Sequence, residues 1–157
     1  MAKDKTAKAR ARGGVNPFQK LETPAEIMSA AKSGAVVSGY IGLSYGLQAG
    51  SLYLSGSDLF GNSGIAVLTG DVIAIAFAAW LTFCTLRRQP LWAAIVTAIW
   101  YFAELAGKFA APSAGQQVAA GGFGWIIMFA ALASGAILGI RGAWKLRQGT
   151  DIAEVFE

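Results

Sequence analysis

The sequence predicts an all-α integral membrane protein: a bundle of four transmembrane helices with both termini cytoplasmic and a short N-terminal interfacial helix. Of its 157 residues, 55% are hydrophobic and 14% are charged, whereas about a quarter of a soluble domain is charged. The 107 residues from Gly34 to Ile140 contain six formally charged side chains, which are Asp58, Asp71, Arg87, Arg88, Glu104 and Lys108. The length suits four spans of about 20 residues each.

Two segments precede the first span. Residues 1–22 form a basic tail, which we expect to be disordered in the cytoplasm. Residues 23–33 begin an amphipathic interfacial helix, because Thr23 can cap it, Pro24 suits its first turn and Glu26 completes a capping box.

Four apolar stretches follow and form a transmembrane domain over residues 34–147. The predicted spans cover about 34–54, 65–86, 91–111 and 123–140. They are separated by a turn-rich connection at 55–64, the basic turn RRQP at 87–90 and an uncharged loop at 112–122. Residues 148–157 are predicted to be an acidic cytoplasmic tail.

The basic residues predict the orientation. Residues 1–33 contain seven Lys and Arg, the 87–90 turn contains two and the chain after residue 140 contains three, so twelve of thirteen share one side. The positive-inside rule places that side in the cytoplasm, and we expect a bacterial inner membrane. Anionic lipid headgroups are the expected partners of Lys3, Lys5, Lys8, Arg10, Arg12, Arg87, Arg88, Arg141, Lys145 and Arg147. A nucleic-acid partner is not expected.

The composition also limits the chemistry. The chain has no histidine and one cysteine, Cys84 within an apolar stretch, which removes histidine-ligated metals and Ser-His or Cys-His nucleophile pairs. The glycine-rich AAGGFGW at 119–125 lacks the lysine of a phosphate loop. We therefore expect no enzymatic activity, no metal site and no cofactor.

Polar side chains of three spans are predicted to reach the same depth. Asp71 and Glu104 each stand seven residues from the outer end of their spans, which is roughly 10 Å at the rise of an α-helix. Lys108 follows Glu104 at i+4, a pairing distance, and the same cluster includes Gln48 and Tyr101. Such a cluster is either a proton or ion site or an acid–base cluster that fixes helix packing, and we expect the second.

A line of small residues marks the first span. Its members, which lie within about 40° of one line at 100° per residue, are Ala35, Gly39, Gly42, Gly46 and Gly50. Small residues let a second backbone approach closely in a bilayer. That second helix is either the fourth span, through Gly135 and Gly139, or belongs to another protein.

These observations favour a non-catalytic polytopic membrane protein, a structural or accessory subunit that packs through its glycine-lined face into a homo-oligomer or a larger complex. One alternative is a small ion- or proton-coupled transporter that uses the acidic and basic cluster. A second is a pore-forming, lysis-type protein, with which small size and glycine-rich helices are compatible.

Overall fold

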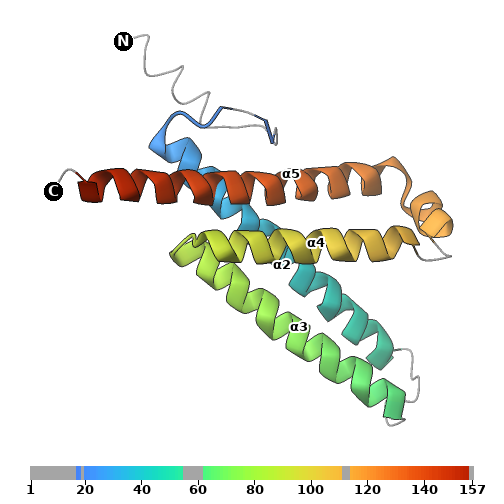
Figure 1. Ribbon diagram of the computed structural model, residues 1–157. Coiled ribbons are helices and arrows are strands. Elements are labelled where there is room, and N and C mark those ends of the chain that lie inside the picture. Colours follow the sequence, from blue (N-terminus) through green and yellow to red (C-terminus); the bar gives the residue numbers. More distant parts are fainter. Residues whose placement is uncertain (1–16, 19, 55–61, 111–113, 156–157) are drawn as a thin grey trace, which may run out of the picture.

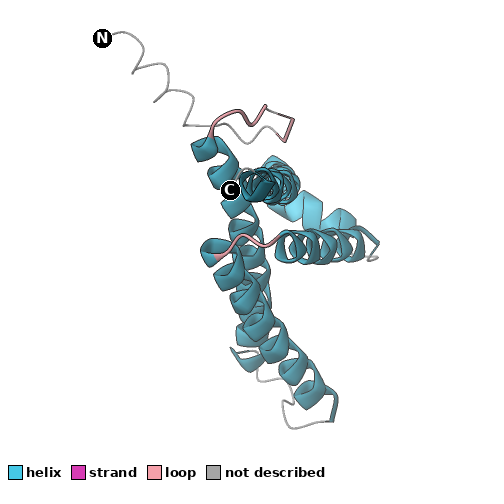
Figure 2. Ribbon diagram, turned by 60° about the vertical axis from the view of Figure 1, so that its left-hand side comes forward, coloured by secondary structure: helices cyan, strands magenta, loops and turns pink. Residues whose placement is uncertain are grey.

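The computed structural model describes residues 17–18, 20–54, 62–110 and 114–155. All regular elements in those ranges are α-helices, so the all-α prediction is confirmed for them (Figure 2). The helices are α2 (Pro24–Leu54), α3 (Asn62–Arg87), α4 (Leu91–Ala110) and α5 (Ala114–Val155).

Among the described residues, three helices are long and apolar enough to cross a membrane. They contain the stretches Gly64–Arg87, Leu91–Ala110 and Gly124–Gly149, from α3, α4 and α5. α2 is longer than α3 and α4 but is rich in glycine and hydroxyl residues, and it does not reach the same apolar character. The chain is thus a membrane protein by the length and composition of three helices.

Two boundaries differ from the sequence prediction. Residues 24–33 are not a separate interfacial helix, because α2 runs without a break from Pro24 to Leu54 and buries Ala30 and Ala31 inside the fold. The 112–122 loop is also shorter than predicted. α5 begins at Ala114 and continues to Val155, through a sequence without proline in which alanine, glutamine and leucine favour the helix.

The helices form two antiparallel pairs joined at a crossing. α2 pairs with α3, α4 runs beside α5, and the two pairs diverge toward the C-terminal end of α2 (Figure 1). α2 is the central element because the two most extensive helix contacts, with α5 and with α3, are both made by α2, which also touches α4. The core at the crossing draws on every helix, and its buried members are Val37, Ile41, Ala78, Ala98, Tyr101, Leu132 and Ala136.

The backbones of α2 and α5 come closest at the crossing. A Cβ atom added at Gly142 would lie 2.2 Å from the Ala31 nitrogen, and one at Gly139 would lie 3.0 Å from the Gly34 nitrogen. The Ser33 hydroxyl also donates to the Gly135 carbonyl at 2.7 Å. Glycines of α5 are therefore required for this contact, as in small-xxx-small packing.

The chain before α2 is held against α5. The predicted capping box is confirmed, since Glu26 N–H donates to the Thr23 hydroxyl at 3.2 Å and Thr23 N–H donates to the Glu26 carboxylate at 3.1 Å. Leu21 is buried beside Ala30 and Leu138. This segment thereby fixes the entry of α2 to the bundle.

Candidate functional site

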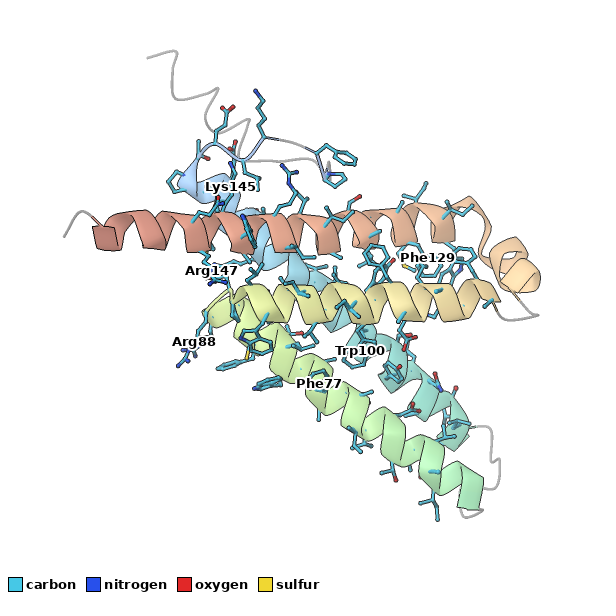
Figure 3. All side chains as sticks on the ribbon, viewed as in Figure 1. Phe77, Arg88, Trp100, Phe129, Lys145 and Arg147 are labelled. Carbon is cyan, nitrogen blue, oxygen red and sulfur yellow. The ribbon has the colours of Figure 1, made fainter. Side chains whose placement is uncertain are left out.

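A small polar pocket lies between α2, α4 and α5. Its cavity is ≈ 10 Å³, close to the smallest volume that admits one water molecule. The residues around it are Tyr40, Ile41, Ser44, Tyr45, Tyr101, Glu104, Leu105, Lys108 and Phe129. Figure 3 labels Phe129 of α5, which lines the pocket, and Trp100 of α4, whose ring packs on that of Tyr45.

The carboxylate of the pocket binds a phenol. The Tyr45 hydroxyl on α2 donates to Glu104 Oε1 on α4, and the Tyr45 ring lies 5.9 Å from the Trp100 ring, centroid to centroid. Glu104 therefore has a hydrogen-bond donor from another helix, which suits a carboxylate inside the bundle.

The i+4 pairing of Glu104 with Lys108 is not formed. Within the described ranges the two side chains make no ion pair, because the Lys108 ammonium turns to two aromatic rings. It lies 5.8 Å from the Tyr40 centroid and 5.8 Å from the Phe129 centroid. Both distances fall within the range of cation–π attraction.

Asp71 on α3 is buried, with 3% of its surface exposed, and does not line the pocket. Its Oδ2 atom has no hydrogen-bond partner among the described residues. The carboxyl is within electrostatic range of Tyr45, whose hydroxyl already binds Glu104. Tyr45 of α2 therefore has a hydrogen bond to the carboxylate of α4 and a weaker, longer-range electrostatic interaction with the carboxyl of α3.

Of the other two residues of the predicted cluster, Tyr101 lines the pocket and Gln48 does not. Tyr101 is buried at the pocket, and its hydroxyl donates to the Phe129 carbonyl at 2.8 Å. Gln48 is exposed on α2 and does not line the pocket. The structure therefore groups Tyr101, Glu104 and Lys108, with Asp71 nearby.

Sequence reasoning did not include Tyr45 or Phe129 in the site. Both are aromatic residues within apolar stretches, where the ordinary expectation is core packing or lipid contact. Their roles depend on contacts with Glu104 and Lys108 of another helix. The spacing of residues within one helix carries no signal for such contacts.

The glycine face of α2 is only partly covered. Ala35 is buried, and a Cβ at Gly42 would lie 3.2 Å from Ala78 on α3. Cβ atoms at Gly39, Gly46 and Gly50 would meet no described atom within 4 Å. Meanwhile Gly135 and Gly139 of α5 contact α2 near Ser33, Gly34 and Val37, closer to its N-terminus.

The basic residues of α3 and α5 gather at one end of the bundle, where Figure 3 labels Arg88, Lys145 and Arg147. Arg87 stacks 5.2 Å from the Phe83 centroid, whereas Arg141 and Lys145 donate to the carbonyls of Pro17 and Leu21. Two predicted headgroup ligands therefore also hold the chain before α2. The predicted ligands Lys3, Lys5, Lys8, Arg10 and Arg12 lie outside the described residues.

No protein-family model matches the chain, and no curated protein or solved structure is significantly similar to it. Among the described residues, no three His, Cys, Asp or Glu side chains gather where they could hold a metal ion.

Proposed function

We propose that the chain is a non-catalytic membrane subunit that joins a homo-oligomer or a larger membrane complex through the outer half of α2. The observation that carries this proposal is the open space in front of Gly39, Gly46 and Gly50. These glycines leave a shallow surface where a second helix can approach closely. Leu43 and Leu47 on the same half of α2 are 62% and 67% exposed and offer apolar contacts.

A lipid-facing helix has no need of such a surface. Lipid chains adapt to large apolar side chains as readily as to glycines, whereas a neighbouring backbone reaches van der Waals contact only over small residues. The glycines that do pack within the chain, such as Gly34 and Gly139, follow the same rule. The open half of α2 therefore has the composition of a helix contact, and no described residue of its own chain covers it.

Gly46→Leu is expected to abolish assembly and to leave the fold of the subunit unchanged. The new side chain meets no described atom of its own chain within 4 Å of its Cβ, but it prevents the close approach of a second helix. Crosslinking in native membranes and native mass spectrometry after mild extraction measure the loss of the oligomer or complex.

Gly70→Leu on α3 is the matched control, because its Cβ would also meet no described atom within 4 Å. We expect this variant to assemble like the wild type. A wild-type chain that is monomeric and without a partner in native membranes would refute the proposed role. Equal loss of assembly in both variants would refute the assignment of the contact to α2.

The second candidate function is a small proton- or ion-coupled carrier. It is favoured by the buried Asp71, whose Oδ2 lacks a partner in the described structure, beside the hydrogen-bonded pair Tyr45–Glu104. Ionisable groups in a bilayer are costly, at about 2.5–3.5 kcal/mol on insertion scales, and commonly mark ion pathways.

In this second case, Asp71→Asn and Glu104→Gln are expected to abolish proton-coupled flux in reconstituted vesicles. Each change removes a titratable carboxyl but keeps its size. Tyr45→Phe removes the hydroxyl that donates to Glu104 and is expected to reduce flux by about tenfold, the equivalent of one hydrogen bond. Fluorescence of a trapped pH dye reports the flux. A wild-type chain without flux across a broad substrate screen excludes the carrier.

We also propose that both termini are cytoplasmic in a bacterial inner membrane, as the clustering of Arg88, Lys145 and Arg147 at one end supports. In a Cys84→Ala background, Asp58→Cys is expected to react with a membrane-impermeant maleimide in intact cells. Arg88→Cys is expected to react only after the membrane is opened. The reverse pattern would overturn the orientation.

A further inference from the structure

Lys108 places its ammonium in an aromatic cage built by two other helices. The nitrogen lies 5.8 Å from the Tyr40 centroid on α2 and 5.8 Å from the Phe129 centroid on α5. The Tyr101 hydroxyl, on the same helix as Lys108, donates to the Phe129 carbonyl at 2.8 Å and so holds this part of α5 in place. Three helices therefore fix the position of one cation.

Lys108 makes no ion pair with Glu104, the carboxylate that lines the same pocket. Glu104 stands one turn earlier on α4 and accepts a hydrogen bond from Tyr45. In the described structure the carboxylate and the ammonium make no direct contact, although both face the same pocket. The carboxylate thus lowers the electrostatic cost of any cation in the cage without selecting a particular contact.

The free volume shows how a second cation would have to enter. The cavity that remains beside Lys108 is ≈ 10 Å³, room for about one water molecule. A cation larger than a water molecule does not fit in this volume next to Lys108. The charge of the lysine ammonium also repels any second cation there. It must take the place of the lysine amine.

We propose that this pocket is a binding site for a small primary ammonium ion, occupied in this structure by the protein's own Lys108 side chain. Aromatic faces, phenol oxygens and a nearby carboxylate recognise the charge and N–H groups of an amine. Hard metal cations prefer several carboxylate or carbonyl oxygens, whereas Glu104 is the one carboxylate among the residues that line this pocket. The site goes beyond subunit assembly and does not depend on it.

The test removes the tethered amine and supplies a free one. Lys108→Ala deletes three methylenes and the ammonium, which n-propylammonium replaces. We expect the variant to melt at a lower temperature than the wild type in detergent. n-Propylammonium chloride is expected to raise its Tm by about 2–4 °C, because that is the shift that the free energy of one cation–π contact produces in a chain of this size. The wild type is expected not to respond at the same concentration, because its tethered amine competes.

Three controls identify the interaction. Sodium chloride at equal ionic strength and 1-propanol, a neutral molecule of similar shape, are expected to leave the Tm of Lys108→Ala unchanged. The double variant Lys108→Ala with Tyr40→Leu lacks one wall of the cage and is expected not to respond to the amine. A Tm of Lys108→Ala that is the same with n-propylammonium as with sodium would overturn the proposal, as would an equal response of the double variant.

A second route applies if Lys108→Ala does not fold. Lys108→Cys in a Cys84→Ala background is alkylated in the membrane with 2-bromoethylamine. The thiolate displaces bromide, and the resulting S-aminoethyl cysteine carries an ammonium group at the end of a side chain as long as that of lysine. Iodoacetamide forms a neutral adduct at the same sulfur. We expect the first adduct to recover the wild-type Tm and the second to remain lower. Equal Tm values for the two adducts would show that the cage does not recognise an ammonium.

Discussion

Gly142→Ala is expected to destabilise the fold more than any other change of comparable size. Its Cβ would lie 2.2 Å from the Ala31 nitrogen and 2.7 Å from the Ala30 carbonyl carbon. Both contacts are with backbone atoms, which cannot rotate away as a flexible side chain can. α2 and α5 must separate instead, and we expect a loss of about 3 kcal/mol of unfolding free energy. Reversible unfolding in mixed micelles measures the loss.

Two other glycines of α5 provide a comparison, because a Cβ atom would be less crowded there than at Gly142. A Cβ at Gly139 would lie 3.0 Å and 3.1 Å from the nitrogen and Cα atom of Gly34, so Gly139→Ala is expected to lower stability by about 1 kcal/mol. A Cβ at Gly149 would meet no described atom within 4 Å. There Gly149→Ala is expected to be neutral or to stabilise the helix by up to about 1 kcal/mol. A Gly142→Ala variant as stable as Gly149→Ala would show that the two helices do not cross at this point.

The sequence predicts which glycines share one face of a helix, but it does not predict which of them contact another helix. Helical spacing placed Gly39, Gly42, Gly46 and Gly50 on one line, but only Gly42 of these contacts another helix in the described structure. The reason is the crossing of α2 and α5, which keeps their backbones together only near Gly34 and lets them diverge beyond it. A crossing point depends on both helices together, so the pattern of one helix does not reveal it.

The local predictions agree better with the structure because they depend on neighbouring residues. The capping box of Thr23 and Glu26 was predicted from a spacing of three residues, and both hydrogen bonds form. The i+4 pair of Glu104 and Lys108 has an equally local basis, yet it is absent among the described contacts. Each partner has a better alternative on another helix: a phenol for the carboxylate and two rings for the ammonium.

Asp71→Val is expected to make the protein more stable, by about 2 kcal/mol. The carboxyl is 3% exposed and its Oδ2 has no partner in the described structure, so its burial lacks the compensation that a hydrogen bond would give. Valine is apolar and close to aspartate in size, and it removes this cost. The stability is measured by the same reversible unfolding in mixed micelles.

Asp71→Asn is the matched control, since the amide keeps the shape but buries polar atoms as the carboxyl does. We expect it to remain within about 0.5 kcal/mol of the wild type. If Asp71 were a packing element of an acid–base cluster, both variants would instead lose stability, because a partner would be left unpaired. A gain for Asp71→Val alone would mean that aspartate reduces the stability of its own fold. Such a residue is typical of a functional site, where stability is given up for activity. This result would exclude a packing role for Asp71 but would leave the assembly role of α2 untouched, and only flux in the vesicle measurements would support the carrier.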